Sequence, residues 1–264
     1  MVKRAKRATK QNPREERNTP EYKGRNRNNS NNHNNSHSKD NISFEKSKRN
    51  IEIIPRSVKQ EDLLFSLKDE NKAITFAIGP AGSGKTLIST LWAIKSLKEG
   101  LIKKIVISRP NIAVDDKDIG YLPGDILSKM APWIRPITAE MEEYFSKAEI
   151  EQLITNEVIE IVPIAFMRGR TFKNSIILLD EAQNTTPNSL LSAMTRIGDG
   201  SRMIITGDIK QSDRKGSSNG LSDFVKRFEN NNSDMIDVIR FDDRDVQRHP
   251  VIKDILKMYK DIDL

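Results

Sequence analysis

Cysteine is absent from the 264 residues, which excludes disulfide bonds and thiolate metal sites. Histidine is almost as scarce, because only His249 of the three lies outside the first 40 residues. A histidine metal centre in the rest of the chain would therefore lack a second His ligand. No apolar run reaches about eighteen residues, so a membrane-spanning helix is not expected. The N-terminus also lacks the apolar segment of a secretory signal. We therefore expect a cytoplasmic protein with no membrane partner.

Positive charge is concentrated at the N-terminus. Residues 1–40 carry eleven Lys and Arg against four Asp and Glu, an excess that equals the net charge of +7 for the whole chain. Residues 1–50 also have few aliphatic side chains and an Asn-rich run over 26–35. Such a composition cannot bury a core, so it predicts a disordered basic arm over 1–50 and one folded domain over 51–264. The arm could bind the phosphates of a nucleic acid, or it could simply keep the chain in solution.

A glycine-rich octet lies between an apolar run, Ala73–Ile78, and an amphipathic run, Thr86–Glu99. Its pattern, Gly, four residues, Gly-Lys-Ser/Thr, is that of a P-loop, and a strand before it and a helix after it are the expected context. Glycines let the backbone N–H groups converge on phosphate at the N-terminus of the helix, while the lysine and hydroxyl contact phosphate and Mg²⁺. The candidate nucleotide-binding residues are Gly79, Pro80, Ala81, Gly82, Ser83, Gly84, Lys85 and Thr86.

A pair of carboxylates follows a later apolar run. Asp180 and Glu181 come directly after 175–179, in the Walker B form. Adjacent carboxylates at the end of a buried strand cost desolvation free energy unless a cation or water contacts them. We therefore expect Asp180 to hold Mg²⁺ beside Thr86, and Glu181 to orient and deprotonate an attacking water. Gln183, two residues on, could couple this site to a ligand bound outside it.

Further apolar runs over 104–110, 158–162, 202–208 and 235–241 read as buried parallel strands. Together they predict an α/β fold: a single P-loop NTPase (RecA-like) domain with a mostly parallel sheet of five or more strands and helices on both faces. Ligands of such sheets lie beyond the C-terminal ends of the strands, so Arg109 is either a phosphate or nucleic-acid contact or a surface residue. Residues 111–157 read as a helical insertion that is broken at Pro132 and Pro136.

The sequence argues against two other classes of P-loop protein, the GTPases and the nucleotide kinases. The guanine-reading Asn-Lys-x-Asp pattern of GTPases is missing, because Asn71 and Lys72 are followed by Ala73 and Ile74 and precede the P-loop. Nucleotide kinases lack a catalytic Glu after the Walker B Asp, whereas Glu181 favours water as the nucleophile. The sequence therefore predicts ATP hydrolysis with ATP and Mg²⁺ bound.

Taken in order, a set of short motifs resembles the signatures of the PhoH-like ATPases over roughly residues 55–260. They are Gly-Pro-Ala-Gly-Ser-Gly-Lys-Thr at 79–86, Ser-Arg-Pro at 108–110, Gly-Tyr-Leu-Pro-Gly-Asp at 120–125, Phe-Met-Arg-Gly-Arg-Thr at 166–171, Asp-Glu-Ala-Gln-Asn-Thr-Thr-Pro at 180–187, Thr-Arg-Ile-Gly at 195–198, Thr-Gly-Asp-Ile-Lys-Gln at 206–211 and Arg-His-Pro at 248–250. That family is similar to the motor core of superfamily 1 helicases. The resemblance implies that Gln60 reads adenine and that Gly207, Asp208 and Gln211 sense the γ-phosphate. It also implies a stand-alone form like those carried by bacteriophages, in which case the cytoplasm is that of the host.

The resemblance implies a Mg²⁺-dependent ATPase, possibly a helicase, that acts with RNA or single-stranded nucleic acid. The catalytic residues would be Lys85, Glu181 and Gln211. Because superfamily 1 helicases complete the site with an arginine from a second core, a homo-oligomer such as a hexameric ring is expected here. The candidate arginines acting on a neighbouring subunit are Arg168, Arg170, Arg196 and Arg248. The alternatives are an ATP-controlled nucleic-acid-binding switch with little turnover and a P-loop kinase of small molecules.

Overall fold

Six short apolar segments form the strands of one sheet. They are β1 (Ile74–Ile78), β2 (Lys104–Ser108), β3 (Ile159–Ile161), β4 (Ser175–Leu179), β5 (Arg202–Gly207) and β6 (Ile236–Arg240). Their order across the sheet is β3-β2-β4-β5-β1-β6, and every neighbouring pair is parallel. The C-terminal ends of all six strands therefore lie along one edge, where open α/β sheets bind their ligands. The predicted α/β fold with a parallel sheet is confirmed.

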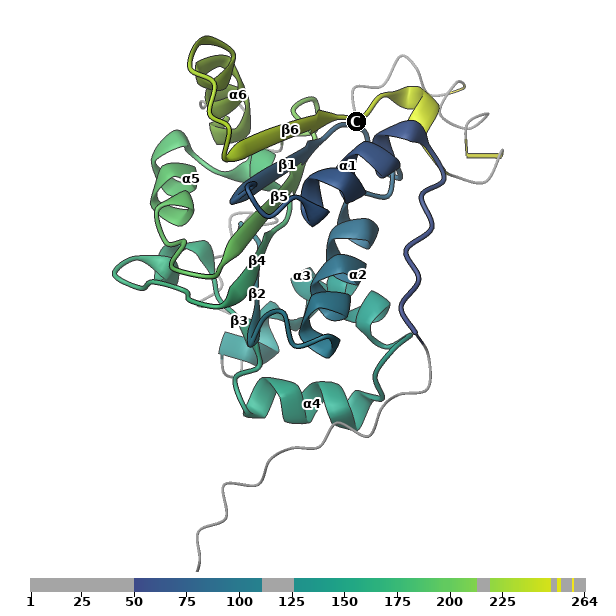
Figure 1. Cartoon of the computed structure of the whole chain (residues 1–264), viewed down its shortest axis with the longest axis vertical. Coiled ribbons are helices and arrows are strands. Elements are labelled where there is room, and N and C mark those ends of the chain that lie inside the picture. Colours follow the sequence, from purple (N-terminus) through teal and green to yellow (C-terminus); the bar gives the residue numbers. More distant parts are fainter. Residues whose placement is uncertain (1–49, 111–125, 213–218, 248–250, 253–257, 259–264) are drawn as a thin grey trace, which may run out of the picture. The chain divides into compact units, whose positions relative to one another are not determined.

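This computed structural model describes residues 50–110, 126–212, 219–247, 251–252 and 258 (Figure 1). All of them belong to the second of two units, Met1–Ser43 and Phe44–Leu264. The arm predicted over 1–50 (apart from residue 50), the motif at 120–125 and His249 lie outside the described residues. Among the helices of the described ranges, none combines the length and apolarity needed to cross a bilayer.

The helices surround this sheet on two faces. They are α1 (Val58–Lys68), α2 (Lys85–Lys98), α3 (Ile126–Met141), α4 (Lys147–Thr155), α5 (Pro187–Met194) and α6 (Gly220–Asn230), with 3-10 turns η3 (Ile164–Met167), η4 (Ala182–Asn184) and η5 (Asp243–Asp245). Side-chain caps start several of them: Ser57 accepts from the backbone N–H of Gln60, and Ser146 forms a capping box with Glu149.

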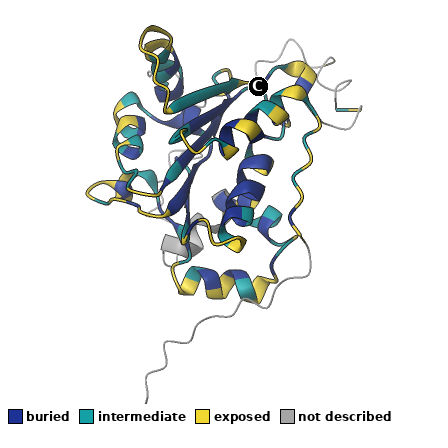
Figure 2. Cartoon of the chain, in the orientation of Figure 1, coloured by how far each residue is buried: buried dark blue, intermediate teal, exposed yellow. Residues whose placement is uncertain are grey.

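Two hydrophobic cores, one on each face, hold the helices to the sheet (Figures 1 and 2). The first joins α1, α2, α3 and α4 to side chains such as Ala77, Ile107 and Leu178. The second joins α5 and α6 to the alternate side chains, such as Phe76 and Ile177. Strands buried on both faces read as continuous apolar runs, which is why the sequence locates them so closely.

Helix α3 runs through both prolines, so the predicted breaks at Pro132 and Pro136 are wrong. Each proline lacks a backbone N–H and strains an isolated helix. Both prolines lie on the exposed side, four residues apart, while Ile134, Ile137 and Met141 are buried against the first core. Packing of that apolar face outweighs the local cost, since helix stability in proteins comes mainly from tertiary contacts.

The edge strand β3 carries a charge cluster that makes stability depend on pH. Glu160 accepts hydrogen bonds from Lys104 at 2.8 Å and from Arg170 at 2.5 Å. Burial alone would raise the pKa of Glu160, but the hydrogen bonds and charges of the two cations outweigh it and hold the pKa below 4.5. The folded state thus binds the proton less tightly than the unfolded state. The cluster stabilises the fold above about pH 4.5, and its contribution is lost as the pH falls through the folded pKa.

We expect Glu160→Gln to unfold more easily than the wild type in urea at about pH 7, and the difference to shrink at about pH 3.5. Paired urea titrations at the two pH values measure this. A difference that widened on acidification would contradict the pairing.

Candidate nucleotide-binding site

The loop between β1 and α2 has the backbone of a phosphate cradle. Gly82 and Gly84 have φ of 85° and 84°, in the left-handed region that side chains rarely adopt. Gly84 is the N-cap of α2, so the free N–H groups of the first helical turn follow directly after it. Helix N-termini of this kind attract anions through these N–H groups and the helix dipole.

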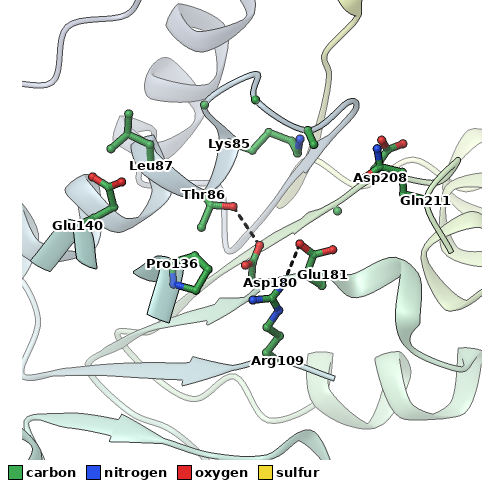
Figure 3. Close-up of a pocket in the computed structure, with 14 residues that line it drawn as sticks. Lys85, Thr86, Leu87, Arg109, Pro136, Glu140, Asp180, Glu181, Asp208 and Gln211 are labelled. Atoms are coloured by element: carbon green, nitrogen blue, oxygen red, sulfur yellow. Dashed lines mark hydrogen bonds and ion pairs between the residues drawn. The ribbon is translucent and has the colours of Figure 1, made fainter. Parts of the chain in front are cut away.

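Lys85 lies folded against its own loop. Its Nζ donates to the carbonyl oxygen of Pro80 at 2.7 Å and to Oγ of Ser83 at 3.1 Å, and the residue is only 8% exposed. Ser83 donates in turn to the same Pro80 carbonyl at 2.9 Å. The ammonium group is thereby held within the loop instead of extending into solvent. Figure 3 shows it beside the cavity described below.

Asp180 joins the end of β4 to the start of α2. Its Oδ1 accepts a hydrogen bond from the Thr86 hydroxyl at 3.0 Å and another from the Thr206 hydroxyl on β5 (Figure 3 shows the first). The carboxylate is 5% exposed, so these two donors offset part of its desolvation cost. One hydroxyl and one carboxylate are hard oxygen ligands, and Mg²⁺ typically uses few protein ligands together with substrate phosphates. The donor set therefore fits Mg²⁺.

Glu181 is held at both carboxylate oxygens. Oε1 lies 3.0 Å from a terminal guanidinium nitrogen of Arg109, at the end of β2, and Oε2 accepts from the side-chain amide of Gln183. Its φ of 57° is in the left-handed region, which is uncommon for a non-glycine residue. Backbone strain of this kind persists only where the surroundings fix it, and it concentrates at functional sites.

These elements enclose one cavity of about 540 Å³ at the C-terminal edge of the sheet. Asp208 and Gln211 contribute from the segment after β5 (Figure 3). The cavity is lined by Ala81, Gly82, Gly84, Lys85, Thr86, Leu87, Arg109, Pro136, Glu140, Asp180, Glu181, Gly207, Asp208 and Gln211.

Two lining residues from α3, Pro136 and Glu140, were missed by sequence reasoning. The helix lies in the long insertion, and nothing in its pattern distinguishes a wall of the cavity from a helix that only covers the sheet. Burial, and secondarily the charge of Glu143, raises the pKa of Glu140. The cavity therefore has a fourth carboxyl group besides those of Asp180, Glu181 and Asp208, and it lies on the side opposite Glu181 in Figure 3.

Gln60 lies beside the loop, but its amide already has partners. Its Nε2 donates to the carbonyl oxygen of Ser83 at 2.9 Å, and its Oε1 accepts from the backbone N–H of Arg56 at 2.8 Å. It is 4% exposed. Reading of adenine by Gln60 stays a prediction, and it would require the amide to exchange one of these partners.

The four candidate arginines differ in how they are held. Arg170 is paired with Glu160, and Arg196 donates to carbonyl oxygens of neighbouring backbone. Arg168 is exposed and has no hydrogen bond or ion pair within the described part of the chain. Arg248 lies outside the described residues. None of the three described arginines lines the cavity of its own chain.

Comparison with known proteins places this chain in a family. The family described as PhoH-like protein matches residues 52–260. The PhoH-like protein of Bacillus subtilis strain 168 is 39% identical over 205 residues, which are 77% of this chain and 63% of the relative. Protein PhoH of Escherichia coli K12 is 37% identical over 209 residues, 78% of this chain and 58% of the relative. The chain thus spans about three fifths of the length of these relatives.

Among solved structures, the large terminase from a thermophilic bacteriophage aligns with 78% of this chain and 51% of its own, at 10% identity and a TM-score of 0.45. The family match covers the chain from just before α1 to beyond the last described residue. Its extent and the identities to the two bacterial relatives show that the chain belongs to the PhoH-like protein family.

Proposed function

We propose that this chain is a Mg²⁺-dependent ATPase that acts with RNA or single-stranded nucleic acid as a homo-oligomer, its ATPase domain spanning 51–264. The observation that carries the proposal is the 3.0 Å hydrogen bond from Thr86 to Asp180, which connects the loop after β1 to the end of β4 beside the cavity. P-loop enzymes use this pair of side chains to hold the metal next to the phosphates.

In this proposal the backbone N–H groups of the P-loop and the ammonium of Lys85 bind the β- and γ-phosphates of ATP. To do so, Lys85 would exchange contacts such as the one with the Pro80 carbonyl, an acceptor within its own loop, for phosphate oxygens. Thr86 and Asp180 would hold Mg²⁺, which when bound neutralises charge that develops on the phosphates. Because such reactions need little covalent chemistry from the protein, catalysis rests on positioning and charge.

Glu181 and Gln211 would complete the reaction centre. Glu181 orients the water that attacks the γ-phosphate and accepts its proton. Gln211, whose amide can both donate and accept, lies in the segment after β5 and would contact the γ-phosphate. Both side chains line the same cavity as Lys85 and Thr86, which supports these roles.

The oligomer is proposed because the described arginines of the 168–198 region do not line the cavity of their own chain. Arg168 is the best described candidate for a contact with a neighbouring subunit, since it is exposed while Arg170 and Arg196 are held by their own chain. A neighbouring arginine would stabilise the transferring phosphoryl group, as arginine fingers do in other P-loop enzymes.

Comparison of the wild type with Glu181→Gln tests the function. We expect the wild type to release phosphate from ATP with Mg²⁺, and the variant to lose about 100-fold or more of that rate while still binding ATP. Glu151→Gln, on the exposed surface of α4, is the matched control and should keep the wild-type rate. Each protein is assayed alone, with RNA and with single-stranded DNA.

The outcomes separate the alternatives. Negligible turnover in wild type and variant under all conditions, with ATP still bound, would favour a nucleic-acid-binding switch. Phosphate transfer to a small molecule that survives Glu181→Gln would favour a kinase. The same assay, run over a range of protein concentrations, tests the oligomer. A constant rate per chain, together with a monomeric mass in solution at every concentration, would contradict the proposed homo-oligomer.

A further inference from the structure

Gln183 is a buried amide that connects the segments following two neighbouring strands, β4 and β5. It is 2% exposed and lies in η4, the 3-10 turn that begins directly after Asp180 and Glu181. Its Oε1 accepts from the backbone N–H of Asp208, after β5, at 3.1 Å, and its Nε2 donates to Oε2 of Glu181. An amide is suited to this place because it offers an acceptor at one atom and a donor at the other, which no carboxylate or hydrocarbon side chain does.

The last residue of β5, Gly207, has no side chain and so leaves space for this amide. A Cβ added at Gly207 would lie 2.7 Å from Oε1 of Gln183, 2.8 Å from Cδ2 of Leu221 and 3.3 Å from the backbone nitrogen of Ala182. Each of these separations is too short for a side chain to fit without movement of its surroundings. Glycine at 207 therefore allows Gln183 to reach the N–H of the next residue, Asp208.

The Glu181 carboxylate is consequently fixed from two directions. Gln183 holds one oxygen, and Arg109, from the end of β2, holds the other. A carboxylate with a donor on each oxygen has a defined plane, whereas removal of one donor leaves it free to turn toward the remaining one. Without Gln183, the charge of Arg109 would draw Glu181 toward β2.

We propose that Gln183 is a positioning residue that couples the segment Asp208–Gln211 to the Glu181 carboxylate. This inference rests on the proposed function. Gln211 is in the same short segment as Asp208, and its backbone N–H donates to the Asp208 carbonyl at 3.1 Å. A movement of that segment toward the γ-phosphate carries the Asp208 N–H, and through Gln183 it sets the direction of the carboxylate that orients the water. Hydrolysis is thereby tied to correct engagement of the γ-phosphate.

Two substitutions at this position separate coupling from simple packing. Gln183→Leu removes the donor and acceptor at similar volume. Gln183→Glu keeps the shape but places a second carboxylate beside Glu181 at neutral pH, and the like charge raises the pKa of the introduced group. Once protonated, that group can donate to Glu181 as the amide does. Gln152→Glu, on the exposed surface of α4, is the matched control.

We expect both variants to lose about 10- to 100-fold in kcat for ATP, with the Kd for ATP and Mg²⁺ within about threefold of the wild type. From about pH 8 to about pH 6, the rate of Gln183→Glu relative to wild type should recover, while that of Gln183→Leu should not. The effect of Gln211→Ala on kcat should also be smaller in the Gln183→Leu background, because the two residues act in one chain of contacts.

Other results would overturn the inference. They are kcat values within about twofold of the wild type, equal pH profiles for the two variants, or a fully additive effect of Gln211→Ala. If Gln183→Leu fails to fold by thermal unfolding, Gln183→Met, which also lacks the donor and the acceptor but has an unbranched side chain, supplies the same test and must show the same loss of kcat. An inactive wild type would defeat the proposed function, whereas an active wild type with unaffected variants defeats only the role of Gln183.

Discussion

Replacing Gly79 by alanine should lower the free energy of unfolding by about 4 kcal/mol. Gly79 begins the P-loop with a φ of 148°, a backbone conformation that L side chains rarely adopt. An added Cβ would lie 2.4 Å from the backbone oxygen and 2.7 Å from Cβ of Phe241. Backbone cannot move aside as a flexible side chain can, so strain and overpacking add together at this site.

The surroundings of Gly79 explain why the fold cannot relax around it. Its N–H donates to the carbonyl oxygen of Gly207 at 3.0 Å, and the N–H of Phe241 donates to the carbonyl oxygen of Ile78 at 2.7 Å. The glycine is therefore packed between the ends of β5 and β6, the two strands that flank β1. Any shift that relieves the alanine must break one of these strand contacts.

Gly100→Ala is the matched control. Gly100 also has a positive φ, of 74°, but nothing lies within 4 Å of an added Cβ. That substitution carries backbone strain without a clash, so its cost should be about 1 kcal/mol. Urea unfolding of both variants measures the difference, and equal losses would show that the contact with Phe241 does not matter.

The strands and helices differ in how well the sequence predicts them. The four inner strands, β1, β2, β4 and β5, are found within a residue or two because each is an apolar run covered on both faces. Helix α3 was wrongly divided because proline is a local signal, whereas burial of Ile137 and Met141 is a property of the whole domain. The order of strands in the sheet could not be read from the runs themselves.

The candidate site likewise has contacts that the sequence could predict and contacts that it could not. Parallel strands place their C-terminal ends together, so the proximity of Thr86 and Asp180 could be anticipated from their positions after two such strands. The link from Gln183 to Asp208 could not, because it depends on the rotamer of one side chain and on the space left by Gly207. For Gln60, the sequence predicts an amide that reads adenine, but it could not show that the amide is already hydrogen-bonded to Ser83 and Arg56.

Asp180→Asn is expected to remove about 100-fold or more of the Mg²⁺-dependent ATPase rate while leaving the fold intact. An asparagine carbonyl can accept the same hydrogen bonds from Thr86 and Thr206 that Oδ1 accepts in the wild type. The substitution removes the negative charge from a side chain that is only 5% exposed. Because a buried charge carries a desolvation cost, the free energy of unfolding should change by less than about 1 kcal/mol or rise.

Thermal unfolding distinguishes loss of metal from loss of nucleotide. With ATP and chelator, wild type and Asp180→Asn should be stabilised alike, since Lys85 and the loop N–H groups contact phosphate without the carboxylate. Adding Mg²⁺ should then stabilise only the wild type further. Asp199→Asn, whose side chain is 96% exposed, is the control and should behave as the wild type does. If Mg²⁺ stabilised Asp180→Asn as much as the wild type, the metal would be held elsewhere, and the contact between Thr86 and Asp180 would be structural alone.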